Sequence, residues 1–330
     1  MTGMAENLSI VLGQHGQVAD LRSGAVTVDD CDLRFVDVRR MPDAYRDMAR
    51  SQPYDICEMA PTSYLMAVAA GAPITALPLP MTRRFRHAGL QRPAGSDLRT
   101  PKDIEGRRVG VRTYAVTAGV WTRGIYADEF GVDPAKVTWL TAEDENVQSA
   151  PLPANVHRID PGTSLADLLS NGELDAVYGG LAGVGASGGS SVDELIDLVS
   201  NADELELQWF ERTGIYPLHG VIVIRNDVLD RLTWLPTALF DAFARAKQNY
   251  LQRIESGAAA EAEDRRYLRL SELVGDPLPY GLEENAESLA ALVRYARRQG
   301  LIAEEPPIEN VFPDPRTAGH LADAHLSRGN

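Results

Sequence analysis

The sequence predicts an α/β protein of two lobes, each built on a mainly parallel sheet with helices on both faces. One observation is the order of the elements, because short apolar runs typical of strands alternate with stretches that have helical spacing. A second is the length of 330 residues, which exceeds the usual size of one domain. A third is the hydrophobic content of 44%, which is sufficient for two cores.

The first lobe begins with strands and helices in alternation. Apolar runs predict its strands, and apolar residues at helical spacing predict its helices. Thr62 or Ser63 can cap the second helix, and Gly71 and Pro73 follow its end. In chain order, the predicted elements are a strand over Leu8–Leu12, a strand over Leu33–Val38, a helix over Met41–Arg50, a strand over Asp55–Cys57, a helix over Tyr64–Ala70 and a strand over Ile74–Leu79.

The second lobe is predicted to begin after a polar stretch rich in Pro and Gly, Arg92–Gly106. The apolar run Leu218–Ile224 predicts the strand that returns the chain to the first lobe. We therefore expect residues 1–105 and 217–330 to form lobe 1, residues 106–216 to form lobe 2, and a ligand cleft to lie between them. The remaining predicted elements are strands over Arg108–Arg112, Val137–Leu140 and Ala176–Tyr178, and helices ending at Tyr126–Phe130 and covering Ser164–Ser170, Pro236–Ser256, Glu261–Leu273 and Leu282–Gln299.

The composition excludes several classes of partner. The net charge of −15 argues against nucleic acid or an anionic membrane as the main partner. No apolar run approaches the roughly 20 residues that span a bilayer. Cys31 and Cys57 both lie in apolar stretches, which favours buried thiols. Met1 to Asn7 lacks the basic start of a signal peptide, so we expect a cytoplasmic protein.

Polar residues follow several predicted strands at the points where ligands bind in open parallel sheets. One such junction contains His15 between two glycines, a second extends from Glu58 to Ser63, and a third extends from Arg112 to Thr117. An acidic protein that binds an anion needs local donors of this kind. The alternative is that Ser and Thr at these places only cap helices.

The basic cluster from Arg83 to His87 stands out in so acidic a chain. Arginine provides the planar, bidentate donor that a carboxylate prefers, although a charge run is often only a solvated surface. His219 begins a strongly apolar run, so it is either a structural histidine or an acid or base that titrates near neutral pH. The six histidines show no metal-ligand spacing, and no nucleophile elbow or nucleotide-binding loop is present.

The segments Phe85-Arg86-His87 and Thr117-Ala118 with Trp121 and Arg123-Gly124 belong to a set of blocks that extends along nearly the whole chain. These blocks resemble the 4,5-dihydroxyphthalate decarboxylases, and the two segments are the most specific of them. Two positions beside Tyr114 depart from the family pattern, in which an acidic residue and an amide stand where this chain has Thr113 and Ala115. The other matching blocks are Asp55–Met59, Arg83, Arg108–Val111, Val120, Phe130–Val132, Gly172–Ala176, Tyr216–His219, Pro279–Gly281 and Asn285.

The resemblance implies a type II periplasmic-binding-protein-like fold and a carboxy-lyase that acts on a hydroxylated aromatic acid without a redox cofactor. A ring hydroxyl supplies electron density, and a general acid protonates the ring carbon as CO2 leaves. The resemblance implies His219 or His87 as the acid and Glu58 as a base or an orienting group. The residues it implies for substrate binding are Arg83, Arg86, Arg123, Tyr114 and Thr117. Ser63 and His15 are added as candidate binding residues because they lie at the polar strand junctions described above.

The expected partner is a small anionic aromatic substrate, and the resemblance favours a homo-oligomer. No cofactor is expected, although assistance by a divalent metal stays open. Two alternatives also stay open: a solute-binding or sensor protein for an aromatic carboxylate, and another enzyme on the same fold that resembles those of the menaquinone pathway.

Overall fold

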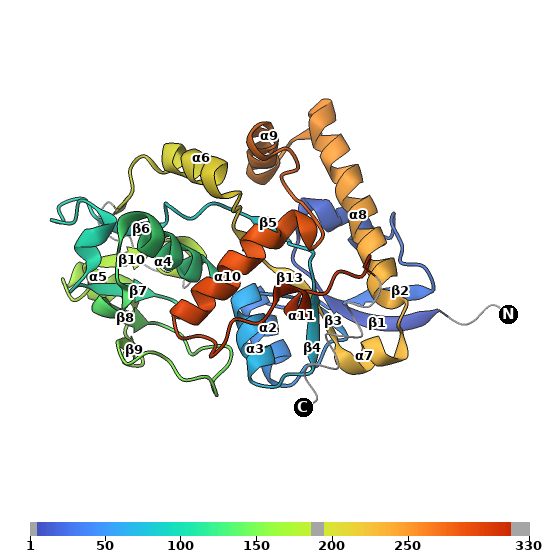
Figure 1. The fold of residues 1–330 in the computed structure, drawn as a ribbon, viewed down its shortest axis with the longest axis horizontal. Helices are drawn as coiled ribbons and strands as arrows, with labels where there is room; N and C mark the ends of the chain where they lie inside the picture. The colour runs from blue at the N-terminus through green and yellow to red at the C-terminus, as the bar shows by residue number, and fades with distance from the viewer. Residues whose placement is uncertain (1–4, 186–194, 318–330) are drawn as a thin grey trace. The chain divides into compact units, whose positions relative to one another are not determined.

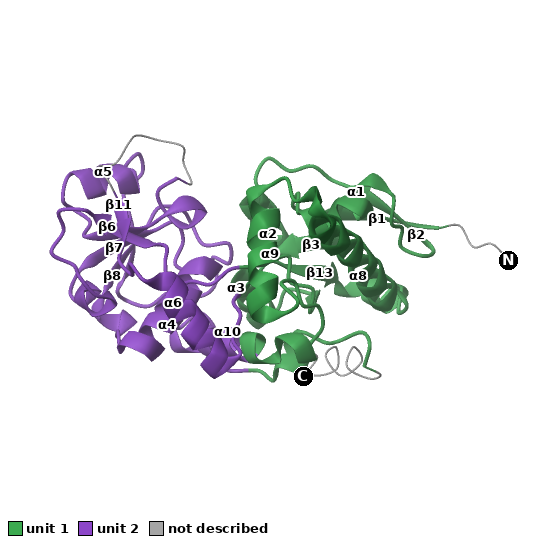
Figure 2. Cartoon of the chain, turned by 90° about the horizontal axis from the view of Figure 1, so that it is seen from above, with its two compact units in different colours: residues 1–83, 218–289, 306–330 green, residues 84–217, 290–305 purple. Residues whose placement is uncertain are grey.

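The computed structural model describes residues 5–185 and 195–317, and Figure 1 shows the fold. The chain forms two compact units, which Figure 2 colours separately. Unit 1 contains the described parts of residues 1–83, 218–289 and 306–330, and unit 2 contains those of residues 84–217 and 290–305.

These boundaries differ in two places from those predicted. The chain leaves unit 1 after Arg83, and the polar stretch 92–106 lies within unit 2. The reason is that β6 (Leu90–Pro93), which overlaps this stretch, pairs with β10 (Ala176–Tyr178) and β11 (Leu195–Asp197) of that unit. Residues 290–305, expected in lobe 1, also group with unit 2.

Unit 1 contains a mixed sheet with the strand order β2-β1-β3-β13-β4. β1 runs parallel to β2 and β3, whereas β13 runs antiparallel to β3 and β4. β5 and β12 pair separately and antiparallel. The predicted strand Leu218–Ile224 is thus two strands, because Gly220 interrupts it with a φ of 72°. The bounds are β1 Glu6–Val11, β2 Cys31–Phe35, β3 Ile56–Met59, β4 Ile74–Leu77, β5 Thr82–Arg83, β12 Leu218–His219 and β13 Val221–Arg225.

The core of unit 1 lies between this sheet and its helices. Ile10 and Ile222 pack in one cluster with Leu239 and Phe243 of the long helix α8. Contacts also join α2 to β3 and α3 to β4. The helices are α1 Ala19–Ser23, α2 Met41–Arg50, α3 Pro61–Ala69, α7 Asn226–Arg231, α8 Leu235–Arg253, α9 Ala262–Val274 and α11 Ile308–Val311, with shorter helical turns at Gly16–Val18, Ile254–Ala258 and Glu283–Asn285.

Unit 2 contains a second mixed sheet with the order β11-β6-β10-β7-β8-β9. The strands from β10 to β9 run parallel, and β6 runs antiparallel to both of its neighbours. The remaining strands are β7 Arg108–Val111, β8 Thr138–Thr141 and β9 Val156–Arg158, and the helices are α4 Thr117–Phe130, α5 Leu165–Ser170 and α6 Ala202–Thr213, with shorter turns at Pro101–Ile104, Pro134–Lys136 and Gly180–Ala182.

Helix α10 (Ala286–Arg298) continues across the boundary at residues 289 and 290. Its part in unit 2 packs against α4, where the ring of Tyr295 meets that of Trp121 edge to face at 5.7 Å between centroids. A Cβ atom at Gly124 would lie 2.2 Å from Tyr295 Cδ2, so the ring occupies the space that the glycine leaves. No helix in the described ranges is both long and apolar enough to cross a membrane.

Candidate functional site

The sheet of unit 1 brings His15 and Glu58 into contact. β1 and β3 run parallel, with Val11 opposite Cys57, so the loop after β1 and the end of β3 meet at one edge. His15 Nε2 lies 2.9 Å from Glu58 Oε2. Glu58 is buried, with 3% of its surface exposed, whereas about a quarter of the His15 side chain is exposed. One partner of the pair is therefore enclosed and the other reaches the surface.

Three further groups surround the Glu58 carboxylate. The backbone N–H of Gly13 donates to Oε2 at 2.9 Å, and the Tyr45 hydroxyl of α2 donates to Oε1 at 3.3 Å. A Cβ atom at Gly13 would lie 2.6 Å from His15 Nε2, and one at Gly220 would lie 2.7 Å from Glu58 Oε1. The carboxylate thus fits between two positions where only glycine leaves enough space.

These contacts favour the ionised pair. Burial by itself raises the pKa of Glu58, but the charge and hydrogen bond of His15, together with the donors of Gly13 and Tyr45, outweigh burial and lower it. Burial likewise lowers the pKa of His15, but the charge and hydrogen bond of Glu58 outweigh it and raise it. Glu58 is therefore a carboxylate near neutral pH, and it stabilises the imidazolium form of His15.

His219 and Arg83 come from the paired strands β12 and β5. His219 is half-buried, pairs with Thr82 between β12 and β5, and directly precedes Gly220. Arg83 is 1% exposed, and it donates to the side chains of Asn285 and, at 3.5 Å, Ser288. The guanidinium expected to bind a substrate carboxylate is thus engaged inside unit 1.

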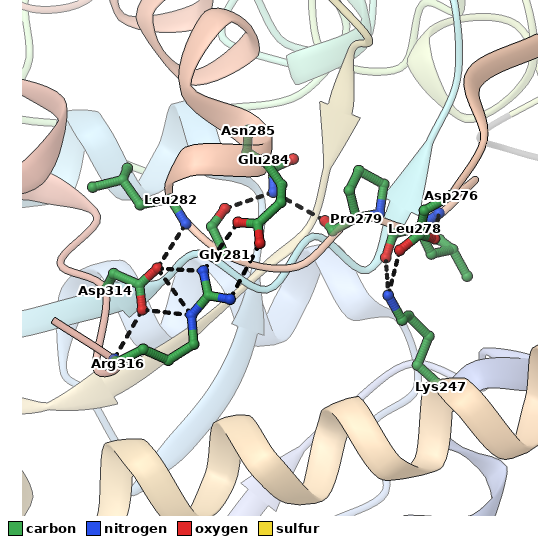
Figure 3. A network of polar contacts seen from close by, with 10 residues as sticks. All are labelled: Lys247, Asp276, Leu278, Pro279, Gly281, Leu282, Glu284, Asn285, Asp314 and Arg316. Atoms are coloured by element: carbon green, nitrogen blue, oxygen red, sulfur yellow. Dashed lines mark hydrogen bonds and ion pairs between the residues drawn. The ribbon is translucent and has the colours of Figure 1, made fainter.

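The turn that carries Asn285 is fixed by a network of polar contacts, shown in Figure 3. Asn285 Nδ2 donates to the carbonyl groups of Pro279 at 2.9 Å and Gly281 at 2.7 Å. Arg316 Nη2 lies 2.7 Å from Asp314 and 3.0 Å from Glu284, the latter in the same turn. The Pro279–Gly281 and Asn285 blocks noted in the sequence therefore stabilise this turn.

Lys247 of α8 holds the start of the same turn. Its Nζ lies 2.6 Å from Asp276 and 3.0 Å from the Leu278 carbonyl oxygen (Figure 3). The same ammonium group lies 4.8 Å from the centre of the Tyr280 ring. The turn is thus attached to α8, to β5 and to the segment that contains Arg316.

Ser63 is also in unit 1, in the first turn of α3, where it is 4% exposed. Burial of this kind does not distinguish a structural serine from one that binds a substrate, so the role of Ser63 in substrate binding stays a prediction.

His87 lies in unit 2 in an apolar setting. It is 1% exposed, and neither ring nitrogen has a hydrogen-bond partner within residues 5–185 and 195–317. Its Nδ1 is 3.9 Å from Glu206 Oε1 and its ring lies against Trp209 at 5.3 Å. Burial, and then the charge of Arg212, lower the pKa of His87 to about 4. A neutral imidazole at physiological pH does not favour His87 as the proton donor.

The pKa of the Glu206 carboxyl group beside His87 is raised, whereas that of His87 is lowered. Burial raises its pKa to about 7, although the backbone N–H of His87 donates to it at 3.3 Å. Arg86 is half-buried nearby, and its carbonyl oxygen accepts from the Thr122 hydroxyl at 3.1 Å. Two histidine–carboxylate pairs therefore exist in the described chain segments, and they favour different protonation states.

Arg123 is a buried residue at the centre of unit 2. It is 2% exposed, its guanidinium lies 4.0 Å from the centre of the Tyr114 ring and 5.1 Å from that of Trp139, and its Nε donates to Gln299 at 2.7 Å. A second nitrogen donates to the Tyr114 carbonyl oxygen. Like Arg83, it is engaged within its own unit.

The backbone before α4 is already bound to a carboxylate. Glu145 accepts from the N–H groups of Tyr114 at 2.5 Å and Ala115 at 3.1 Å, and Thr117, also buried, is the first residue of the helix. Burial raises the pKa of Glu145 despite these hydrogen bonds. The donors predicted for a ligand at this junction thus have an acceptor from the chain itself.

The structure brings His15 and Glu58 together, places His219 beside their glycine neighbour, and gives Arg83 and Arg123 internal partners. Tyr45, Glu145 and Glu206 were missed. Tyr45 lies within a predicted helix, where nothing in the spacing distinguishes it from other half-buried residues. In the described part of the chain, no group of three or more His, Cys, Asp or Glu residues is arranged to hold a metal ion.

Comparison with solved structures shows the fold. A periplasmic sulfonate-binding protein from Methylobacillus flagellatus KT has a TM-score of 0.54 at 12% identity, with 100% of this chain and 97% of that protein covered. The aliphatic sulphonate-binding protein of Escherichia coli gives 0.53 at 13% identity, covering 95% and 93%. The desulfurization enzyme DSZB gives 0.52 at 14% identity, covering 98% and 100%. The chain therefore has the periplasmic-binding-protein fold.

Comparison with characterised sequences is more specific. No family model matches the chain. The 4,5-dihydroxyphthalate decarboxylase of Comamonas testosteroni is 29% identical over 308 residues, which cover 89% of this chain and 92% of that enzyme. The enzyme of the same name from Pseudomonas putida is 32% identical over 181 residues, covering 52% and 70%. This likeness, which confirms the resemblance seen in the sequence blocks, shows that the chain belongs to the 4,5-dihydroxyphthalate decarboxylase family and is a carboxy-lyase.

Proposed function

We propose that this enzyme decarboxylates a hydroxylated, phthalate-like aromatic acid, with His15 as the proton donor and Glu58 as its ionised partner. The observation that carries the assignment is the 2.9 Å contact between a partly exposed imidazole and an enclosed carboxylate at the carboxyl ends of the parallel strands β1 and β3. Ligands bind at such strand ends in open α/β sheets. The names of the two relatives support the substrate class.

The two nitrogens of His15 have different tasks in this proposal. Nε2 donates to Glu58, which fixes the ring and stabilises its positive charge. Nδ1 is then the nitrogen that carries the proton for the substrate. Because the pKa of His15 is raised and that of Glu58 is lowered, the charged pair persists as the pH rises above the ordinary titration range of histidine. Activity should fall at high pH as His15 loses its proton.

The reaction step balances without an external oxidant or reductant. The ring hydroxyl supplies electron density to the carbon that bears the departing carboxylate, and His15 transfers its proton to that carbon. The bond between the ring and the carboxylate then breaks, its electron pair restores aromaticity, and CO2 leaves. His15 regains a proton from water. We propose that no cofactor takes part, and that the enzyme acts in the cytoplasm on a small anionic aromatic substrate.

The predicted acids can be ranked by experiment. We expect His15→Asn to lower kcat for CO2 release from 4,5-dihydroxyphthalate by about 10²–10⁴-fold, because general acid assistance is of that size. His157→Asn is the matched control, since His157 is an exposed histidine of β9. His219→Asn, which changes the other unit 1 candidate, should keep most of the activity. Release of CO2 is measured with and without a chelator.

Three outcomes would contradict the proposal. If His15→Asn stayed fully active while His219→Asn lost turnover, His219 would be the donor. If the unaltered protein bound hydroxylated aromatic diacids but released no CO2 from any of them, the substrate assignment would be wrong. If a chelator abolished the activity and added metal restored it, the cofactor-free mechanism would be wrong.

A further inference from the structure

The two oxygens of Glu58 are held by different parts of unit 1. Oε2 accepts from His15 and from the Gly13 backbone, both in the loop after β1. Oε1 accepts from the Tyr45 hydroxyl of α2, at 3.3 Å. The backbone of Gly220 also approaches Oε1, since a Cβ atom there would lie 2.7 Å away. Tyr45 is therefore the side chain that binds the oxygen opposite to the histidine.

The position of Tyr45 follows from the way α2 packs. Ala44 and Met48 are buried on the face of α2 that meets the sheet, and α2 contacts β3, the strand of Glu58. Tyr45 is half-buried beside this face, so its ring lies on the edge of the interface and its hydroxyl reaches the strand end. A change to Phe removes the hydroxyl and leaves the ring in place.

We propose that Tyr45 is a positioning residue of the reaction, whose hydroxyl keeps Glu58 ionised and oriented so that His15 stays ready to donate its proton. The inference rests on the proposed function of the His15–Glu58 pair. A phenol O–H donates to a carboxylate but gains little from a protonated carboxyl group, so it favours the charged form. Without it, the buried Glu58 takes up a proton at a higher pH.

Other groups near the pair also affect its charge. Arg22 opposes the positive charge on His15, and Glu263 of α9 favours it. Cys57 and Tyr280 lie close enough to Glu58 for its negative charge to raise their own pKa values, together with the larger effect of burial. None of these groups changes in a Tyr45→Phe variant, so a shift in that variant reports the lost hydroxyl.

The test compares Tyr45→Phe with Tyr54→Phe in the full-length enzyme. Tyr54 is a half-buried tyrosine in the turn before β3, and it is the matched control. We expect the acid limb of the kcat/KM profile for 4,5-dihydroxyphthalate to move up by about one pH unit in Tyr45→Phe, a tenfold change in proton affinity. The profile of Tyr54→Phe should match that of the unaltered enzyme. A purely structural Tyr45 would lower activity equally at every pH.

A second measurement separates this inference from the proposed function. The titration of the Glu58 carboxyl carbon can be followed by NMR, with Glu58→Gln to assign the signal. Its midpoint should rise by about one unit in Tyr45→Phe. An unchanged midpoint would overturn the role of Tyr45 even if the enzyme releases CO2, whereas a shifted midpoint in a protein without decarboxylase activity would overturn only the proposed function.

Discussion

Two pairs of the same residue types, His15 with Glu58 and His87 with Glu206, have opposite protonation preferences. The first pair is in contact at 2.9 Å and its carboxylate accepts from further donors, so charge is retained in a buried place. In the second pair the two side chains are 3.9 Å apart, and burial keeps the imidazole neutral and favours a protonated carboxyl group. Sequence alone does not distinguish them, because the difference comes from distance and the number of donors.

Glu206 should make the stability of the fold depend on pH. Its pKa is raised to about 7 in the folded chain, so folding becomes less favourable as the pH rises from about 4.5 to about 7 and the group must ionise in a buried place. Glu206→Gln removes this cost. The difference in the free energy of unfolding between this variant and the unaltered protein should therefore grow, in favour of the variant, by on the order of 2–3 kcal/mol as the pH rises over that range. Urea unfolding at pH 5 and pH 8 measures it. An equal difference at both pH values would show that Glu206 does not titrate in this way.

Single residues of the candidate site could be found in the sequence, but their contacts could not. His15 and Glu58 each stand out as polar residues after a strand, whereas their pairing depends on the parallel register that places Val11 opposite Cys57. The arginines show the converse. Arg83 and Arg123 have the chemistry of carboxylate binders, but each is buried with partners from distant parts of the chain.

At the scale of elements, the segment between Asp276 and Asn285 joins three separate parts of unit 1 by polar contacts. Arg83 of β5, Lys247 of α8 and Arg316 each bind it through charged hydrogen bonds. Asn285 is the central connection, because one end of its amide binds the turn and the other accepts from Arg83. Buried polar networks of this kind stabilise a fold when each group has a partner.

Removal of the Asn285 amide should therefore destabilise unit 1. Asn285→Ala deprives the buried Arg83 guanidinium of an acceptor, and we expect a loss of about 1.5–3 kcal/mol in the free energy of unfolding. Gln252→Ala, at an exposed position of α8, is the control and should change it by less than about 0.5 kcal/mol. Urea denaturation gives both values. Equal stabilities of the two variants would mean that Arg83 finds another partner.

The elements with strong patterns were the ones that the sequence predicted best. The helix Met41–Arg50 and the strand Ala176–Tyr178 have the predicted bounds. Helix α6 was missed because Ala202 and Trp209 alone form its buried side in a charged segment, and β6 was missed because it ends in a proline within a polar stretch. Both depend on tertiary contacts rather than on local preference.

At the scale of the whole molecule, the predicted α/β fold with two sheets is confirmed, and the division of the chain is finer than expected. Residues 290–305 belong to unit 2 because Tyr295 of α10 and Gln299, which directly follows this helix, pack on α4. No local signal in the sequence marks this return, since the helix is continuous from Ala286 to Arg298. The assignment depends on Gly124, which leaves room for the Tyr295 ring.

Gly124→Ala should weaken the attachment of this helix to unit 2. The added methyl group would lie 2.2 Å from the Tyr295 ring, and overpacking of this kind costs about 1–3 kcal/mol. Gly95→Ala is the control, because Gly95 is exposed and nothing lies within 4 Å of its added Cβ atom. Thermal unfolding should show a lower Tm for the first variant only. A Tm unchanged in both would mean that α10 can shift without loss.

The glycines on either side of the Glu58 carboxylate have a practical consequence for protein engineering. Gly13 and Gly220 come from segments far apart in the chain, yet a substituent at either one would collide with the same acidic group or its histidine. Libraries intended to change the substrate preference should therefore leave both codons fixed. Diversity is better directed to positions outside this contact, so that the His15–Glu58 pair keeps its 2.9 Å distance.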